Sequence, residues 1–351
     1  MKTKITLTLF LIVLSSIMWA QNKPYRVGTT AANFLEMGIG GHANAMGEAY
    51  VSVASDISSI YWNPSGLGYL ENNEVLFMYQ PWIADINVVF AGAAFVLPQV
   101  GTIGLSVTNM DYGRTEVTTM NFQEGTGETY SAADYAFTLS YARKLADWFG
   151  FGASIKWISS NIWHMSANAL ALDLGVMVNT DFFSFSGKRE DGLSIGMSIS
   201  NYGTKMQYDG IDILMPIDPL PDEHGNYNNI EGQYRLQGWE LPLIFRVGTS
   251  IKPIATDNHQ LILAVDALHP NNNSESVNLG AQYAFKFLGV GQFFLRGGYR
   301  GLFMDNSEYG LTFGAGVYVN LMNDNNIKVD FAYKEVGIFG YSMNYSVGVT
   351  F

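Results

Sequence analysis

The chain has 351 residues, a formal net charge of −12, 14% charged and 48% hydrophobic residues, and no cysteine. The acidic balance argues against a nucleic-acid partner, which requires basic patches. The lack of cysteine excludes disulfides, thiolate metal sites and a lipid anchor on cysteine.

The first segment, residues 1–20, predicts a secretory signal peptide. Lys2 and Lys4 precede a short apolar run at 5–14, and Ala20 is a suitable cleavage position. The run is too short to span a membrane comfortably as a helix. We therefore expect an exported protein whose signal is cleaved near Ala20.

The next segment, residues 21–72, is expected to form an N-terminal extension and a hatch. From Ala31 to Leu70 the chain is rich in glycine and alanine and shows no sustained alternation of polar and apolar residues. It precedes the first predicted strand and is long enough to fold inside a barrel. The sequence therefore predicts a plug in the lumen.

Residues 73–351 alternate between apolar and polar side chains in repeated short segments. Successive side chains of a strand face opposite sides, so an apolar face meets lipid and a polar face meets a watery lumen. No later segment offers the ~20 consecutive apolar residues of a membrane-spanning helix. The fold class predicted is all-β, a 14-stranded antiparallel transmembrane β-barrel with a small N-terminal lumenal hatch. The strands centre near Leu76, Ala91, Leu105, Phe137, Ala153, Leu174, Ile195, Phe245, Leu263, Ala281, Leu295, Gly314, Phe331 and Tyr345.

The connections between these strands differ in length. Breaks such as 98–100 and 146–148 are tight, whereas 112–131 and 203–238 are long. Short turns of such barrels face the periplasm and long loops face outward. Long loops on a rigid scaffold often carry recognition, so we expect extracellular loops 112–131 and 203–238 to contact partners.

The last predicted strand runs from Tyr341 to Phe351 and alternates strictly to its end. An aromatic residue at the end of such a strand resembles the carboxy-terminal signal by which outer-membrane barrels are recognised for insertion. Phe351 is therefore the predicted insertion signal, and the predicted location is the cell outer membrane, with outer-membrane lipid around the wall.

Charged residues recur on the predicted lumenal faces. Buried charges must be paired to be tolerated, so a network that clamps the hatch is one interpretation. The other interpretation is that the basic residues bind the carboxylate of a ligand. The candidate ligand contacts in the lumen are Arg246, Arg296, Arg300, Phe294 and Tyr318.

The sequence favours no enzyme, metal or cofactor. The glycines of 38–41 lack the lysine and hydroxyl residue of a phosphate-binding loop. The five histidines have no metal-ligand spacing, and no G-x-S-x-G elbow is present.

Two phrases in the hatch carry a family resemblance: residues 38–50, GIGGHANAMGEAY, and residues 59–67, SIYWNPSGL. Together they resemble the amino-terminal region of the PorV/PorQ family, within the FadL-like (long-chain fatty-acid transporter) barrel superfamily. Ser65 replaces the usual alanine, and His42 stands in the usual alanine stretch. The hatch motif comprises Gly38, Gly40, Gly41, Met46, Gly47, Asn63, Pro64 and Gly66.

The resemblance implies two functions between which the motif cannot choose. PorV-type relatives serve type IX protein secretion and bind the carboxy-terminal domains of cargo, so the partners would be secretion-system proteins or secreted cargo. Other relatives pass long-chain fatty acids, so the alternative is passive transport of a hydrophobic small molecule. Asn63, Pro64 and Gly66 have turn chemistry and are expected where the plug joins the first strand.

Overall fold

The computed structural model describes residues 26–220, 222–223, 230–287, 289–321 and 325–351. The predicted signal peptide, its cleavage position at Ala20, and part of the loop predicted at 203–238 lie outside these residues.

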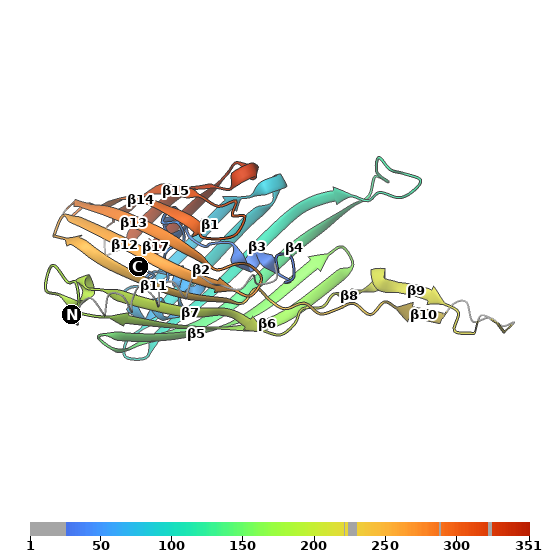
Figure 1. Ribbon diagram of the computed structural model, residues 1–351, viewed down its shortest axis with the longest axis horizontal. Coiled ribbons are helices and arrows are strands. Elements are labelled where there is room, and N and C mark those ends of the chain that lie inside the picture. Colours follow the sequence, from blue (N-terminus) through green and yellow to red (C-terminus); the bar gives the residue numbers. More distant parts are fainter. Residues whose placement is uncertain (1–25, 221, 224–229, 288, 322–324) are drawn as a thin grey trace, which may run out of the picture.

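Fourteen antiparallel strands close into a barrel, which confirms the predicted fold class (Figure 1). Each strand pairs with its neighbour along the chain, and β1 pairs with β17 to close the wall. The barrel strands are β1 (Glu74–Pro81), β2 (Asn87–Leu97), β3 (Gly101–Glu116), β4 (Thr129–Ala146), β5 (Phe149–Ile162), β6 (Met165–Asn179), β7 (Ser194–Gly203), β11 (Ile244–Ala255), β12 (His259–Pro270), β13 (Ser276–Phe287), β14 (Gly291–Leu302), β15 (Leu311–Asn320), β16 (Asn326–Glu335) and β17 (Tyr341–Thr350).

Alternation along each strand separates an apolar outer face from a largely polar inner face. In β6, Leu170, Leu172 and Leu174 are exposed on the outside, whereas Ala171 and Asp173 are buried inside. Exposed leucines in this number are unfavourable in water but suit the hydrocarbon of a bilayer. The outer face is therefore a lipid-facing belt.

The two ends of the barrel differ. At the short-turn end, tight turns follow β2, β4, β11, β13 and β15, and Asn73 and Phe351 exchange two backbone hydrogen bonds. One connection there, residues 180–193, is long, although every long break was expected at the other end. The connections beside it at this end are tight turns. The alternation of polar and apolar residues in β6 and β7 does not by itself indicate at which end of the barrel this connection lies.

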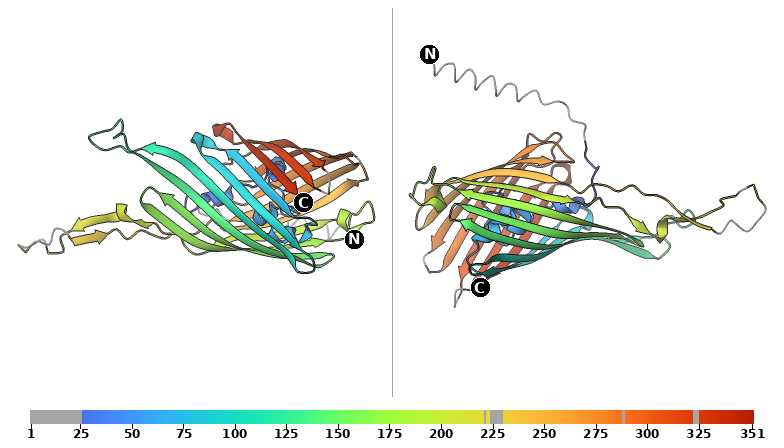
Figure 2. Two further views of the ribbon diagram at one scale, coloured as in Figure 1. Left: turned by 180° about the vertical axis from the view of Figure 1, so that it is seen from behind. Right: turned by 90° about the horizontal axis from the view of Figure 1, so that it is seen from below.

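Two hairpins project from the opposite, long-loop end (Figures 1 and 2). Strand β3 ends at Glu116 and strand β4 begins at Thr129, so both ends of the break predicted at 112–131 are strand. We call residues 117–128 the short hairpin. The arm, residues 204–243, contains β8 (Asp209–Gly210), β9 (Leu214–Ile217) and β10 (Ile230–Gln233), and β9 pairs with β10 away from the barrel.

The helices nearest the N-terminus lie inside the barrel (Figure 2). They are η1 (Asn33–Glu36), α2 (Gly41–Ala45), α3 (Ser59–Trp62) and η2 (Pro64–Tyr69), and we call residues 33–70 the hatch. Short 3-10 turns occupy loops at η3 (Ile83–Asp85), η4 (Arg189–Asp191), η5 (Ile211–Ile213) and η7 (Gly337–Phe339). Among the described residues, no helix is both long and apolar enough to cross a membrane.

The exposed position of Phe351 makes its predicted role in insertion testable. Its side chain is half exposed, so Phe351→Ser removes little packing, and its backbone bonds to Asn73 do not depend on the side chain. We expect less inserted barrel in outer-membrane fractions, scored by heat-modifiable gel migration.

The matched control is Phe287→Ser, which removes an equally exposed aromatic ring from the same end of the barrel. Equal amounts of inserted Phe351→Ser, Phe287→Ser and unmodified protein would show that the terminal ring is not an insertion signal.

Candidate functional site

The hatch crosses the lumen from one side of the wall to the other. Helix α2 lies against β14, β15, β16 and β17, whereas η2 lies against β3, β4, β5 and β6. Apolar side chains of both partners form a shared core, since Ile39, Ile60 and Leu67 of the hatch are buried with Met78 and Phe90 of the wall. The hatch is therefore packed into the barrel as part of its core.

Glycines on the inner face of the wall let the hatch approach closely. A Cβ at Gly152 would lie 2.3 Å from the carbonyl carbon of Pro64, and one at Gly196 would lie 2.2 Å from the carbonyl oxygen of Val51. No side chain fits at such distances. The same holds where Gly175, Gly280 and Gly298 face Asn63, Met46 and Gly47.

Polar side chains of the wall satisfy the irregular backbone of the hatch. The Asp266 carboxylate on β12 accepts hydrogen bonds from the backbone N–H groups of Tyr50 and Val51, at 2.7 and 2.8 Å. The Thr312 hydroxyl on β15 accepts from the Gly47 N–H at 2.8 Å and donates to the Ala45 carbonyl at 3.0 Å. Because buried backbone groups are costly when unpaired, these bonds stabilise the docked hatch.

Ion pairs join the lumenal charges, as one interpretation of the sequence proposed. The Glu48 carboxylate of the hatch lies 2.8 Å from Arg300 and 3.3 Å from Lys334, both on the wall. The remaining pairs are Lys156 with Asp173 at 2.6 Å, Lys328 with Glu74 at 2.9 Å, and Arg296 with Asp330 at 2.6 Å.

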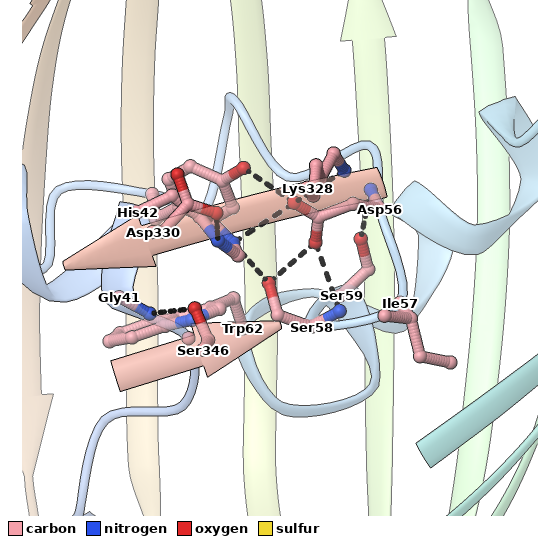
Figure 3. A network of polar contacts seen from close by, with 12 residues as sticks. Gly41, His42, Asp56, Ile57, Ser58, Ser59, Trp62, Lys328, Asp330 and Ser346 are labelled. Carbon is pink, nitrogen blue, oxygen red and sulfur yellow. Dashed lines mark hydrogen bonds and ion pairs between the residues drawn. The ribbon is translucent and has the colours of Figure 1, made fainter. Parts of the chain in front are cut away.

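His42 connects the hatch to this network (Figure 3). Its Nε2 lies 2.9 Å from Asp56 Oδ2 and 3.0 Å from the Ser58 hydroxyl, and its Nδ1 lies 3.5 Å from Asp330 on β16. Burial alone would lower the pKa of His42, but the negative charge of Asp56, aided by Asp330, outweighs burial and raises this pKa to about 9. The histidine is therefore an imidazolium at neutral pH.

The Asn63-Pro64-Ser65-Gly66 turn lies against β5 and β6. The Asn63 amide donates to the carbonyls of Val51 and Val176, at 2.8 and 3.0 Å, and its oxygen accepts from the Ser65 N–H. A Cβ on Gly66 would lie 2.3 Å from the Ala54 carbonyl oxygen. The motif thus docks the last helix of the hatch, η2, on the wall shortly before the chain enters β1 at Glu74.

The other residues of the predicted motif surround α2. Gly40 and Gly47 adopt left-handed backbone angles at the two ends of this helix, with φ of 88° and 63°. The Gly41 N–H donates to the Ser346 hydroxyl of β17, and Met46 is fully buried. A Cβ on Gly38 would meet the side chains of Asn44 and Glu48.

The five predicted ligand contacts do not form one site. Arg296 pairs with Asp330 and lies 4.6 Å from the ring centre of Phe294, whereas Arg300 pairs with Glu48. Tyr318 is half buried, and its nearest neighbour in strand register on β16 is Lys328.

Arg246 lies apart from these residues, on β11. Its guanidinium donates to the Ser200 hydroxyl at 3.0 Å and lies 5.4 and 5.7 Å from the ring centres of Tyr61 and Trp62 in the hatch. Among the described residues, no carboxylate lies within ion-pair distance of this buried guanidinium.

A small cavity lies between hatch and wall. It has a volume of about 20 Å³ and is lined mostly by apolar side chains, including Phe34, Ile60 and Phe90, with Lys156 at its polar edge. A water molecule fits in such a space, but a drug-sized or fatty ligand needs roughly 300 Å³ or more. Larger depressions of about 790 and 850 Å³ lie at the short-turn end and are lined by charged residues.

The arm and the short hairpin expose apolar side chains beyond the lipid-facing belt. At the tip of the short hairpin, Met120 is 93% and Phe122 is 62% exposed. The arm exposes Ile211, Leu214, Ile217, Leu220, Ile230 and Tyr234. The arm, which contains most of the loop predicted at 203–238, therefore presents an apolar surface.

Three groups of hatch contacts were missed in the sequence. His42 was treated as one of five scattered histidines, although its departure from the usual alanine was a usable signal. Glu48 was not recognised as the carboxylate that pairs with Arg300 and Lys334. The wall glycines were not connected with the hatch, although their inward positions were the available evidence for close docking.

Comparisons with known proteins agree on a barrel family. A family model described as type IX secretion system protein PorV matches residues 20–216. Among curated proteins, no sequence matches significantly.

Solved structures of transporters share the fold. The toluene transporter TodX of Pseudomonas putida gives a TM-score of 0.55 at 10% identity, over 89% of this chain and 98% of that one. The toluene transporter TbuX of Ralstonia pickettii gives 0.52 at 10% identity, over 89% and 97%. A FadL homologue of Pseudomonas aeruginosa gives 0.52 at 11% identity, over 89% and 97%. At such identities the likeness shows the fold alone.

The docking of the hatch predicts a strong effect of Gly47→Ala. The new Cβ would lie 2.5 Å from the Leu279 carbonyl oxygen and 2.7 Å from the Tyr299 nitrogen, at a φ of 63°. We expect about 2–5 kcal/mol less stability, because overpacking adds to left-handed backbone strain. Denaturant unfolding in detergent measures it. Gly297→Ala is the control, since its nearest contact is at 3.8 Å; equal midpoints for the two variants would contradict close docking.

The raised pKa of His42 predicts a pH dependence. The folded-state pKa of about 9 exceeds the unfolded value near 6.5, so the stabilisation is complete below about 6.5 and is lost as pH rises through about 9. We expect the stability difference between the unmodified protein and His42→Gln to shrink over that range. Thermal unfolding from pH 6 to pH 10 measures it, and a difference independent of pH would mean that His42 is neutral in the barrel.

Proposed function

The chain belongs to the family of type IX secretion system protein PorV, and on that premise we propose that it is a non-enzymatic outer-membrane component of type IX protein secretion or outer-membrane assembly. The family match covers the hatch and the first seven barrel strands, β1 to β7. Secretion components of this kind act by binding other proteins, and no catalytic step is needed for that role.

The proposed orientation places the short-turn end in the periplasm and the long-loop end outside the cell. This assignment follows the general rule for bacterial barrels, in which short turns face the periplasm. Export to the outer membrane would begin with the predicted signal peptide, residues 1–20.

The observation that carries the proposal is the pair of projecting hairpins on a barrel whose lumen is filled. Met120 and Phe122 on the short hairpin, and the apolar residues of the arm, extend beyond the lipid-facing belt. Exposed apolar groups of this size on a rigid scaffold are typical of protein–protein contacts. The ion-paired hatch, in contrast, supports a lumen that stays shut.

The chemistry of the arm favours a particular partner surface. Its carboxylates outnumber its lysine and arginine residues: Asp209, Asp212, Asp218, Asp222, Glu223, Glu231 and Glu240 stand against Lys205 and Arg235. A secretion-system protein or secreted cargo with a basic rim around an apolar patch would complement this surface.

Passive transport of a hydrophobic small molecule remains the second candidate, and Arg246 is the observation that favours it. This buried guanidinium has no carboxylate partner among the described residues, and Tyr61 beneath it also lines the small cavity. Entry of a fatty-acid head group would require the hatch to move, because the cavity is only about 20 Å³.

Truncation of the arm separates these functions. The Tyr234 N–H donates to the Ile213 carbonyl at 3.1 Å, so residues 214–233 can be replaced by a short Gly-Ser linker without straining the barrel. We expect loss of co-purifying secretion-system or cargo proteins, while heat-modifiable migration and fatty-acid uptake stay unchanged.

The control is Arg246→Met, which keeps the arm and removes the unpaired charge from the lumen. Loss of uptake in Arg246→Met, combined with full protein association after truncation of the arm, would favour the transport role over the secretion role.

A further inference from the structure

The connection between β6 and β7 presents three phenylalanine rings at the short-turn end. Phe182, Phe183 and Phe185 are 73%, 68% and 67% exposed, whereas neighbouring turns at this end are tight. We call residues 180–193 the aromatic loop. A cluster of exposed aromatic rings is unfavourable in water and indicates a contact surface.

The aromatic loop is internally braced. Arg189 binds the Asp181 carboxylate through Nε and Nη2, at 2.8 and 3.1 Å. The Ser184 hydroxyl donates to the Lys188 carbonyl at 2.7 Å, and the Leu193 N–H donates to the Phe182 carbonyl at 2.7 Å. These bonds hold the three rings in a fixed arrangement, so their exposure is a feature of the folded loop.

The polar side of the loop faces the mouth of the barrel. Lys252 on β11 lies 3.8 Å from Asp191, and Lys188 and Glu190 line the depression beside Tyr69 of the hatch. Phe182 lines a further depression of about 530 Å³ with the exposed Trp148 and with Val178, and the Asp181–Arg189 pair lines both depressions. Lys188 and Glu190 thus lie toward the mouth, and Phe182 lies beside the lipid-facing belt.

The lipid-facing belt on β6 reaches the short-turn end of the strand. Its outward apolar residues run from Leu170 to Val178, whereas the outward polar pair Ser166 and Asn168 lies at the long-loop end. Val178 is the second-last residue of β6, so the aromatic loop follows the belt directly.

We propose that Phe182, Phe183 and Phe185 insert into the lipid leaflet at the short-turn end and anchor the barrel there. Lipid is favoured over a protein partner because the loop follows the lipid-facing belt of β6 directly and Phe182 lies beside Trp148 and Val178 of that belt. Aromatic rings are also the usual anchors at a membrane interface. This anchor is independent of whether the barrel serves secretion or transport.

The absence of cysteine makes the proposal directly testable by spin labelling. Phe183→Cys and Phe185→Cys are labelled with a nitroxide in the full-length barrel, in vesicles of phosphatidylethanolamine and phosphatidylglycerol. Collision of the label with oxygen is compared with collision with a water-soluble nickel chelate. Oxygen concentrates in hydrocarbon and the chelate stays in water, so their ratio reports depth.

Two reference positions calibrate the ratio: Leu174→Cys in the lipid-facing belt and Asp257→Cys in the exposed turn between β11 and β12. We expect ratios at 183 and 185 close to that of Leu174→Cys and several-fold above that of Asp257→Cys. A ratio equal to that of Asp257→Cys overturns the proposal. So does a label that is open to the chelate in vesicles but shielded in native membranes, which would indicate a protein partner.

The two labelled positions also guard against misfolding. Phe183 has a left-handed backbone, with a φ of 55°, and Phe185 does not. If a substitution at one of these positions disturbs the loop, the label at the other position still reports its depth. Heat-modifiable migration confirms the fold of each variant before labelling.

Discussion

The pairing of buried charges between hatch and wall is the constraint on which this structure depends. A barrel of this size encloses polar inward-facing side chains, and charges removed from water are tolerated only when they are paired. Glu48 and His42 of the hatch supply partners for Arg300, Lys334 and Asp330 of the wall. Without the hatch, Arg300 and Lys334 would lose their carboxylate partner Glu48, so hatch and barrel are expected to be stable only together.

Because the hatch fills the lumen, the surfaces available for binding partners lie at the two ends of the barrel. The inner wall uses its glycines and hydroxyls to seat the hatch, which leaves a cavity of only about 20 Å³ between them. The surfaces that remain open are the hairpins at the long-loop end and the aromatic loop at the short-turn end. Both expose apolar side chains, but the arm combines them with an excess of carboxylates, whereas the aromatic loop places Phe182 beside the lipid-facing belt. The first pattern suits a protein and the second suits lipid.

The solved transporters share the fold of this chain, and this likeness does not extend to function. Their likeness to this chain, at 10–11% identity, concerns architecture, and their transport function does not follow from it. The unpaired guanidinium of Arg246 is the one lumenal feature described here that pairing with the hatch does not explain. In the closed structure this guanidinium stacks on Tyr61 and Trp62 of the hatch.

The sequence by itself determined the barrel, because a period of two residues in polarity specifies which face of each strand meets lipid. It also indicated the hatch, the family and the pairing of lumenal charges. Only the tertiary structure decided which charges pair and that Asn63 docks on β6. These facts join residues such as His42 and Asp330, which are far apart in the chain. Alternation specifies the face of a side chain but carries no information on which distant residue lies opposite.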